Sequence, residues 1–342
     1  MHRPLRLSLD RAALIANWRW LAAMAGVAAG AAIKADGYGL GASEAMATLA
    51  QAGCRDFFVA TWDEAQKLGP VPAGASLSVL HGVGSEDMTA ALASKARPVL
   101  NSVQQVARWK QAASDRPCDV MIDTGMNRLG IRLEELGVAD GLVIETVMTH
   151  LACADEDHPL NAQQLTRFRE VVAQVPARRA SVANSAGICL GRDYSFDLVR
   201  PGLALYGGIP RSEAEGKIVQ VARLQAQVVQ RRLARTGESV GYGATFTAAR
   251  DTELAILNMG YADGYFRSFA GQGAGRVGGH RLPLVGRVSM DLVAIDCSVL
   301  PALREGDWVE LEFDLLAAAQ ATGMSQYELL TSLGERFERV WA

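Results

Sequence analysis

The sequence predicts an α/β fold in which an N-terminal (β/α)8 TIM-like barrel is followed by a C-terminal, mostly-β domain. Short β-favouring runs alternate with helical patterns through the first 206 residues, which is typical of parallel βαβ units. After about residue 215 the pattern changes to strand-like runs separated by glycine-rich turns. A chain of 342 residues is long enough for two domains, which we expect at 1–215 and 216–342.

Eight runs supply the strands of the predicted barrel: residues 30–35, 56–61, 77–81, 97–101, 119–123, 145–150, 180–184 and 203–207. A helix is expected over about 10–24, and further helical patterns lie at 43–53 and 161–175. Eight such units are the number that closes a TIM barrel. A doubly wound open sheet has the same alternation and is the alternative.

The C-terminal part contains strand-like runs at 221–233, 253–260, 281–297 and 307–313. One clear helix is expected there, at about 325–333. No internal repeat or low-complexity segment interrupts this pattern, so the region is predicted to form one β domain.

The composition excludes several classes of function. The 34 basic and 37 acidic residues are interspersed, so no basic stripe suggests a nucleic-acid partner. The five cysteines, at 54, 118, 153, 189 and 297, lack the spacing of a metal site and indicate a cytoplasmic protein with reduced thiols. The alanine-rich run 21–33 is too short to span a membrane. We interpret it as the end of a helix followed by a strand, rather than as the core of a signal peptide.

Lys34 stands at the end of the first predicted strand, where TIM barrels place their active sites. Burial lowers the pKa of a lysine, and a neutral amine can form a Schiff base. Gly37, Gly39 and Gly41 allow close approach of the backbone, and Tyr38 adds a hydroxyl group. A solvated loop lysine is the other interpretation, so the assignment depends on what the other strand ends carry.

The other strand ends carry polar residues that suit the same site. Arg128 follows the fifth predicted strand, His150 ends the sixth, and Arg200 precedes the eighth. The hydroxyl of Ser185 and the N–H groups of Gly202 and Leu203 resemble a phosphate cradle, which TIM barrels often hold beside strands seven and eight. Singly, the histidine could be a core residue and the arginine half of a structural ion pair. Together these residues predict one active site.

Eight segments of the chain resemble the alanine racemase family of pyridoxal-phosphate-dependent isomerases. They are IKADGYGLGA, DTGMNRLG, MTHLACAD, ANSAG, VRPGLALYG, VGYGATF, GYADGY and GRVSMD. The resemblance covers nearly the whole chain and implies interconversion of L-alanine and D-alanine, with pyridoxal 5'-phosphate as the cofactor. It also implies a homodimer with shared active sites and a role in supplying D-alanine for bacterial cell-wall peptidoglycan.

The resemblance further implies a role for each matching residue. Lys34 looks like the lysine that forms the Schiff base, and Tyr261 of the partner subunit looks like the second catalytic base, supported by His150. The expected cofactor contacts are Tyr38, Ser185, Gly202 and Leu203 at the phosphate, and Arg200 at the pyridine nitrogen. The expected substrate-carboxylate contacts are Arg128 and the partner's Met290, while Asp155 and Arg287 look like residues of the entrance corridor.

These roles form a coherent two-base mechanism. Racemisation removes a proton from one face of Cα and returns one to the other face, which a single fixed base cannot do. Lys34 would serve the D-side and Tyr261 the L-side. A tyrosine with a pKa near 10 is a poor base, so it needs polar, cationic neighbours such as His150 and Arg128. An arginine at the pyridine nitrogen cannot readily give up its proton, which would leave the ring neutral and limit side reactions.

Two positions depart from the family pattern. Met121 replaces a lysine, often carbamylated, that usually stands seven residues before Arg128. Either this methionine fills volume in the barrel, or Arg128 lacks its usual anionic partner. We therefore expect a chloride ion near Arg128, unless a carboxylate such as Asp123 serves instead. The C-terminal tail offers Phe337 where the family often has a tyrosine that contacts the phosphate, so that contact is not assigned.

Three rival functions remain for comparison. A broad-specificity amino-acid racemase would use the same two bases with a larger substrate pocket. A decarboxylase of similar architecture should lack GYADGY and carry an essential C-terminal cysteine, whereas Cys297 lies outside any such motif. A pyridoxal-phosphate carrier would resemble the barrel alone, and the long β region argues against it.

Overall fold

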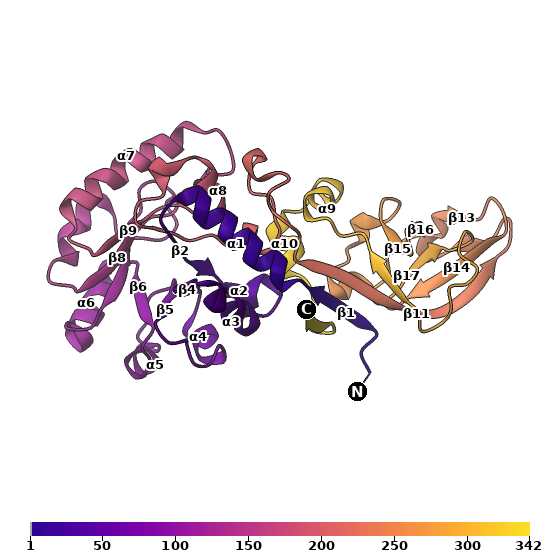
Figure 1. The fold of residues 1–342 in the computed structure, drawn as a ribbon, viewed down its shortest axis with the longest axis horizontal. Helices are drawn as coiled ribbons and strands as arrows, with labels where there is room; N and C mark the ends of the chain where they lie inside the picture. The colour runs from indigo at the N-terminus through magenta and orange to yellow at the C-terminus, as the bar shows by residue number, and fades with distance from the viewer. Residues whose placement is uncertain (1) are drawn as a thin grey trace. The chain divides into compact units, whose positions relative to one another are not determined.

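A computed structural model describes residues 2–342 and divides the chain into two units (Figure 1). One unit is Ala12–Val219, and the other combines the N-terminal residues through Arg11 with Gln220–Ala342. The predicted boundary at 215/216 therefore lies within five residues of the observed change of unit. Among the described residues, no helix is long and apolar enough to cross a membrane.

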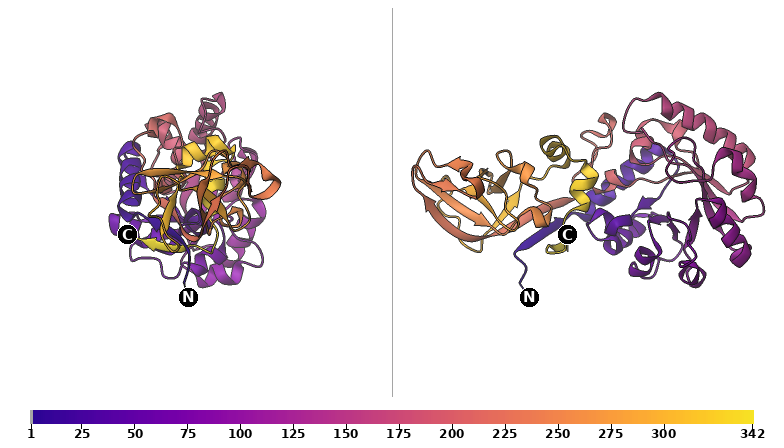
Figure 2. Two further views of the ribbon diagram at one scale, coloured as in Figure 1. Left: turned by 90° about the vertical axis from the view of Figure 1, so that its right-hand side faces the viewer. Right: turned by 180° about the vertical axis from the view of Figure 1, so that it is seen from behind.

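The first unit is built on parallel strands surrounded by helices, as Figures 1 and 2 show. Seven strands pair in the order of the chain: β3 (Ala31–Ala32), β4 (Asp56–Val59), β5 (Ser76–Val79), β6 (Arg97–Leu100), β7 (Cys118–Met121), β8 (Ile144–Met148) and β9 (Arg179–Ser181). The longer helices that accompany these strands are α1 (Arg11–Ala25), α3 (Ala42–Ala52), α6 (Val103–Ala113) and α7 (Pro159–Gln174). Shorter helices are α4 (Trp62–Lys67), α5 (Met88–Ala93), α8 (Ser185–Cys189) and the 3-10 helix η1 (Leu133–Ala139).

The ring closes through β10 (Leu198–Val199), which pairs in parallel with β2 (Ala28–Ala29). On the β9 side, the N–H of Arg200 donates to the carbonyl of Ala183 at 2.8 Å. On the other side, the N–H of Ala32 donates to the carbonyl of Pro201 at 2.8 Å. The closed sheet confirms the predicted TIM-like barrel rather than an open, doubly wound sheet.

The prediction of an eighth strand at 203–207 is wrong. Leu203–Tyr206 forms a 3-10 helix (η3), and the strand precedes it at Leu198–Val199. Leu203, Ala204, Leu205 and Tyr206 are all buried, and a short buried helix has the same apolar pattern as a buried strand. The difference matters for the site, because it moves Arg200 from the beginning of the last strand to its carboxyl end.

The second unit is an eight-stranded sheet in the order β14-β17-β16-β15-β18-β11-β1-β19. Its strands are β1 (Leu5–Leu9), β11 (Ala222–Ala234), β14 (Thr252–Leu257), β15 (Ala274–Val277), β16 (His280–Val285), β17 (Val293–Asp296), β18 (Trp308–Leu311) and β19 (Glu338–Trp341). The long strand β11 pairs with β14 as well as with β18, which closes six of the strands into a ring. A small hairpin, β12 (Ser239–Val240) with β13 (Phe246–Thr247), packs against this sheet through Val240 and Phe246.

Sequence patterns did not reveal every element of this unit. Residues 5–9 fall within the predicted barrel domain, yet they form β1, which pairs antiparallel with β11 and parallel with β19. Helix α10 (Gln326–Thr331) matches the expected helix at 325–333, whereas α9 (Leu315–Thr322) was not expected. The first and the last strand of the chain, β1 and β19, thus lie next to each other at one edge of this sheet.

Candidate active site

Lys34 begins a short turn, α2 (Lys34–Tyr38), directly after strand β3. The next four residues have left-handed backbone conformations, with φ of 51° at Ala35, 50° at Asp36, 62° at Gly37 and 56° at Tyr38. Three of these are not glycine, and each such residue costs about 1–2 kcal/mol. A strained stretch of this kind persists only where surrounding contacts enforce it, and such stretches cluster at functional sites.

Two carboxylates hold the Lys34 turn in place. Glu64 on α4 accepts hydrogen bonds from the N–H of Ala35 at 2.8 Å and of Ala60 at 2.6 Å, so it ties the turn to the end of β4. Asp36 accepts a hydrogen bond from the N–H of Ala42, the first residue of α3, at 2.9 Å. Lys34 is thereby fixed at the carboxyl edge of the barrel.

Four cationic or titratable side chains gather at this edge. Burial and the positive charge of Arg128 lower the pKa of Lys34, against a smaller opposing effect of Glu64. Burial, followed by the charges of Arg200, Arg128 and Lys34, lowers the pKa of His150 to about 3. The imidazole is therefore neutral at physiological pH. The structure thus brings together Lys34, Arg128, His150 and Arg200 from four different strand ends, in a site with an excess of positive charge.

Arg200 lies at the end of β10 and is 6% exposed. Its guanidinium donates to the hydroxyl of Ser181, to the carbonyl of Thr149 at 2.6 Å and to that of Val182 at 3.4 Å. These acceptors are all neutral, and burial lowers the pKa of Arg200 to about 10. Arg200 therefore stays protonated at neutral pH and is held rigidly by β8 and β9.

Tyr38, Ser185 and Gly202 converge beside the same edge. The hydroxyl of Ser185 accepts hydrogen bonds from the N–H groups of Gly202 at 3.0 Å and Ala204 at 3.2 Å. A Cβ added to Gly202 would lie 2.1 Å from the hydroxyl oxygen of Tyr38. This is a cradle that a larger residue would fill, and its donor set of hydroxyls and backbone N–H groups suits a phosphate. Leu203, the remaining predicted phosphate contact, is the first residue of η3.

The chemistry of the edge fits pyridoxal phosphate. A partly buried lysine of lowered pKa suits the aldehyde carbon, and the cradle around Gly202 suits the phosphate. A charged arginine, held by neutral acceptors, suits a hydrogen bond to the pyridine nitrogen.

Gln164 was missed by the sequence analysis. It is fully buried on α7, where its amide donates to the hydroxyl of Thr124 at 3.1 Å and to the carbonyl of His150 at 3.0 Å. It also accepts from the N–H of Ala152 at 2.9 Å. One side chain thus ties the loop that carries Arg128 to the end of β8. Its only sequence signal is a polar residue beside Leu165, on the buried face of a helix.

In the second unit, Tyr261 and Met290 lie on adjoining loops. Tyr261 begins the 3-10 helix η6 (Tyr261–Asp263), and its N–H donates to the carbonyl of Ser289 at 3.0 Å. The next N–H, of Ala262, donates to the carbonyl of Met290 at 3.0 Å. Tyr261 is 37% and Met290 53% exposed. The structure therefore places these two predicted residues side by side on a surface of this unit.

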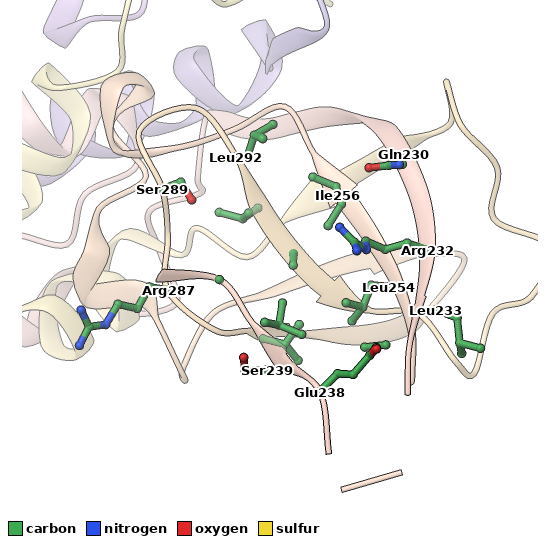
Figure 3. A pocket seen from close by; sticks show the side chains of 16 residues that line it. Gln230, Arg232, Leu233, Glu238, Ser239, Leu254, Ile256, Arg287, Ser289 and Leu292 are labelled. Carbon is green, nitrogen blue, oxygen red and sulfur yellow. The ribbon is translucent and has the colours of Figure 1, made fainter. Parts of the chain in front are cut away.

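A cavity of about 300 Å³ lies next to the Met290 loop (Figure 3). Arg232 and Ile256 line it from β11 and β14, and Ser289 and Leu292 line it from the loop. Arg287, a predicted corridor residue, also lines it and is exposed. Asp155, the other predicted corridor residue, is exposed on the barrel unit.

The structure places both residues that depart from the family pattern, Met121 and Phe337, in buried apolar surroundings. Met121 is 7% exposed and packs with Phe58, Val99, Met148 and Leu198, so it fills volume inside the barrel. Asp123 uses one carboxylate oxygen to accept from the N–H groups of residues 125–127, which shapes the Arg128 loop. Arg128 itself is exposed, and no carboxylate within residues 2–342 forms a salt bridge with it. Phe337 is fully buried and belongs to the core of the β unit.

Comparison with protein families gives two matches that together cover nearly the whole chain. The alanine racemase N-terminal domain matches residues 9–210, and the alanine racemase C-terminal domain matches residues 221–341. The change from one match to the other coincides with the change of unit in the structure.

Individual relatives are similar along nearly their full length. A catabolic alanine racemase of Agrobacterium fabrum is 44% identical over 97% of this chain and 91% of its own. A biosynthetic alanine racemase of the same organism is 41% identical over 98% and 93%. Among solved structures, alanine racemase from Bartonella henselae with covalently bound pyridoxal phosphate has a TM-score of 0.91 and 36% identity, with 100% of both chains covered. The biosynthetic enzyme from Pseudomonas aeruginosa has a TM-score of 0.87 and 33% identity, again with 100% of both chains covered.

Proposed function

The chain belongs to the alanine racemase family and is a pyridoxal-phosphate-dependent enzyme that interconverts L-alanine and D-alanine; from this premise we propose that Lys34 and the partner subunit's Tyr261 are its two bases. The observation that carries the proposal is the convergence of Lys34, Arg128, His150 and Arg200 at one edge of the barrel. The positive charges of Arg128 and Arg200 suit a substrate carboxylate and a phosphate.

We assign the cofactor contacts to the barrel unit. Tyr38, Ser185, Gly202 and Leu203 would hold the phosphate, and Lys34 would hold the aldehyde carbon. When bound, pyridoxal phosphate withdraws electrons from the substrate Cα and so makes its proton acidic. Arg200 would donate a hydrogen bond to the ring nitrogen without transferring a proton, because it stays charged at neutral pH.

The two bases would act on opposite faces of the substrate Cα. Lys34 has a lowered pKa, which favours the neutral amine that accepts a proton on the D-side. Tyr261 would accept or return the proton on the L-side. A neutral His150 can hydrogen-bond the phenolic oxygen, and nearby positive charge favours its deprotonated form. Arg128 and the partner's Met290 would orient the substrate carboxylate.

We propose a homodimer in which the β unit of one chain completes the barrel site of the other. Tyr242, Tyr261, Met290 and Leu292 are large apolar side chains that are 37–71% exposed in the single chain. Three of them lie on the two loops joined by the backbone hydrogen bonds of Tyr261 and Ala262. An exposed apolar cluster of this kind is typical of an interaction surface.

We also propose that chloride occupies the surroundings of Arg128. The support for this proposal is that the Arg128 guanidinium has no carboxylate partner within the described residues. Chloride titration should raise activity or cofactor retention, and bromide soaking of crystals should give an anomalous peak beside Arg128. A carboxylate directly paired with Arg128 in the crystal, with neither of these effects, would refute the idea. Met121→Lys restores the lysine that the family often carbamylates, so this variant tests whether the usual arrangement can be rebuilt. Its activity should become sensitive to bicarbonate.

We propose that the enzyme acts in the cytoplasm and supplies D-alanine for peptidoglycan. The support for this location is that all five cysteines are free, four of them buried. Complementation of a bacterium that requires D-alanine tests the biological role. Kinetics with alanine, serine and lysine test the substrate range, and we expect alanine to be preferred.

The assignment of Lys34 is tested by chemical labelling. The purified yellow protein is reduced with borohydride, which fixes the cofactor to the lysine that holds it, and the labelled peptide is then mapped. We expect the label on Lys34, within the peptide that contains the left-handed turn. A label on Lys67 or any other lysine would contradict the proposed site.

A further inference from the structure

A single arginine near the C-terminus connects the two loops that carry Tyr261 and Met290. The guanidinium of Arg336 donates to both carboxylate oxygens of Asp263, from Nε at 2.6 Å and from Nη2 at 2.7 Å. Its Nη1 donates to Asp291 at 2.7 Å. Asp263 ends the helix that Tyr261 begins, and Asp291 directly follows Met290.

Asp263 is fully buried and shapes the Tyr261 turn from within. One of its carboxylate oxygens accepts from the N–H of Gly260 at 3.0 Å, and its own N–H donates back to the carbonyl of Gly260 at 3.0 Å. Gly260 has no room for a side chain, because an added Cβ would lie 2.2 Å from the carbonyl oxygen of Met290. The two loops are therefore packed backbone against backbone, and Arg336 neutralises the buried carboxylate that organises them.

The three hydrogen bonds of Arg336 all go to the carboxylates that flank Tyr261 and Met290. Arg276 offers a comparison in the same unit, since it pairs with Glu312 at 2.7 Å and is similarly exposed, at 53% against 46% for Arg336. That pair joins β15 to the segment after β18, on neither of the two loops.

We propose that Arg336 is a positioning residue that fixes the Tyr261 hydroxyl for proton transfer on the L-face of the substrate. This inference rests on the proposed roles of Tyr261 and Lys34. A bidentate pair with a buried carboxylate fixes the position and the orientation of the turn that carries Tyr261. This matters for catalysis, because a small displacement of a catalytic group greatly slows proton transfer. Loss of Arg336 should therefore impair the L-side base and leave Lys34 in place.

Proton exchange distinguishes this effect from a general loss of activity. In D2O, Lys34 can take the α-proton of D-alanine, exchange it with solvent on its amine, and return a deuteron to the same face. Nothing else is formed or broken, and the product is deuterated D-alanine. Inversion additionally requires a proton from Tyr261. The ratio of exchange without inversion to racemisation, measured from D-alanine, therefore reports the position of Tyr261.

The experiment compares Arg336→Gln with the unaltered holoenzyme and with Arg276→Gln as a matched control. Loss of the α-proton is followed by NMR, and inversion by a stereospecific coupled assay. We expect Arg336→Gln to lower racemisation roughly tenfold to a hundredfold and to raise the exchange ratio for D-alanine by about the same factor. Arg336→Lys, which keeps the charge but not the bidentate geometry, should fall between, and Arg276→Gln should match the unaltered enzyme.

A second readout needs no cofactor. In the cofactor-free protein, amide deuterium exchange in the peptide containing residues 259–264 should be faster in Arg336→Gln than in Arg276→Gln, because the N–H groups of Gly260, Tyr261 and Ala262 are hydrogen-bonded through these loops. If exchange and racemisation fall together, or if the amide exchange of this peptide is unchanged, the proposal is wrong. If Arg336→Gln does not fold, Arg336→Lys is judged by the same two criteria.

Tyr261→Phe separates failure of this inference from failure of the proposed mechanism. If that variant racemises normally, or cannot exchange the α-proton of D-alanine, the two-base assignment itself fails. If it exchanges without inversion and the Arg336 variants do not, only the role of Arg336 is refuted.

Discussion

Gly202→Ala should weaken cofactor binding by closing the cradle between Tyr38 and Ser185. The added Cβ would lie 2.1 Å from the hydroxyl oxygen and 2.8 Å from Cζ of Tyr38, well inside normal contact distance. Tyr38 is 6% exposed and stacks on the fully buried Tyr206, with ring centroids 4.9 Å apart, so it cannot move aside freely. Its hydroxyl must shift by more than about 1 Å to restore ordinary contact.

Overpacking of this kind costs roughly 1–3 kcal/mol. If the cost is expressed in the cofactor complex, the dissociation constant of pyridoxal phosphate should rise by about 5- to 150-fold. The assay removes the cofactor, titrates it back, and follows the absorbance of the bound form. Gly137→Ala is the control, because its added Cβ would have no neighbour within 4 Å. Wild-type affinity in Gly202→Ala would refute the assignment of Tyr38 and Gly202 to the phosphate.

Two further predictions concern pH and backbone strain. Because the pKa of His150 is lowered to about 3 from about 6.5, the folded protein binds fewer protons than the unfolded chain between these values, so His150 lowers stability as pH falls. The free energy of unfolding of the unaltered protein should therefore fall by about 2 kcal/mol more between pH 7 and pH 5 than that of His150→Asn. Urea titration at the two pH values measures both losses. Identical losses would argue against a neutral His150. Ala35→Gly should stabilise the protein by about 0.5–1 kcal/mol, because glycine adopts the left-handed conformation without the strain of alanine. The control Ala47→Gly, at an exposed position in α3, should destabilise it by about 1 kcal/mol. Equal destabilisation by both variants in thermal unfolding would show that the turn is not strained.

The barrel was predictable because its information is local. Helix-period and strand-period patterns alternate along the chain, and α1, α3 and α7 lie within two residues of their expected ranges. The eighth strand failed because Leu203–Tyr206 is apolar throughout and carries no period. The predicted boundary placed residues 5–9 in the barrel domain because the partners of β1, which are β11 and β19, are far away in the sequence.

The family motifs point to candidate site residues, but they do not reveal the physical setting of those residues. Nothing local in Lys-Ala-Asp-Gly-Tyr indicates a run of left-handed residues, because alanine normally avoids that conformation and contacts such as that of Glu64 with Ala35 enforce it. Arg336 looks like an ordinary surface charge in the sequence, since its buried partner Asp263 lies 73 residues away.

The central claim is that each active site combines Lys34 of one chain with Tyr261 of the other, and mixed dimers test it most directly. Inactive Lys34→Ala and Tyr261→Ala proteins carry different tags, are mixed and exchanged, and mixed dimers are verified by mass spectrometry before D-alanine formation is assayed. If the site is shared, each mixed dimer has one intact site, so activity should recover to about a quarter of the wild-type value at random exchange. If mixed dimers form and remain inactive, Lys34 and Tyr261 do not act together across the two chains.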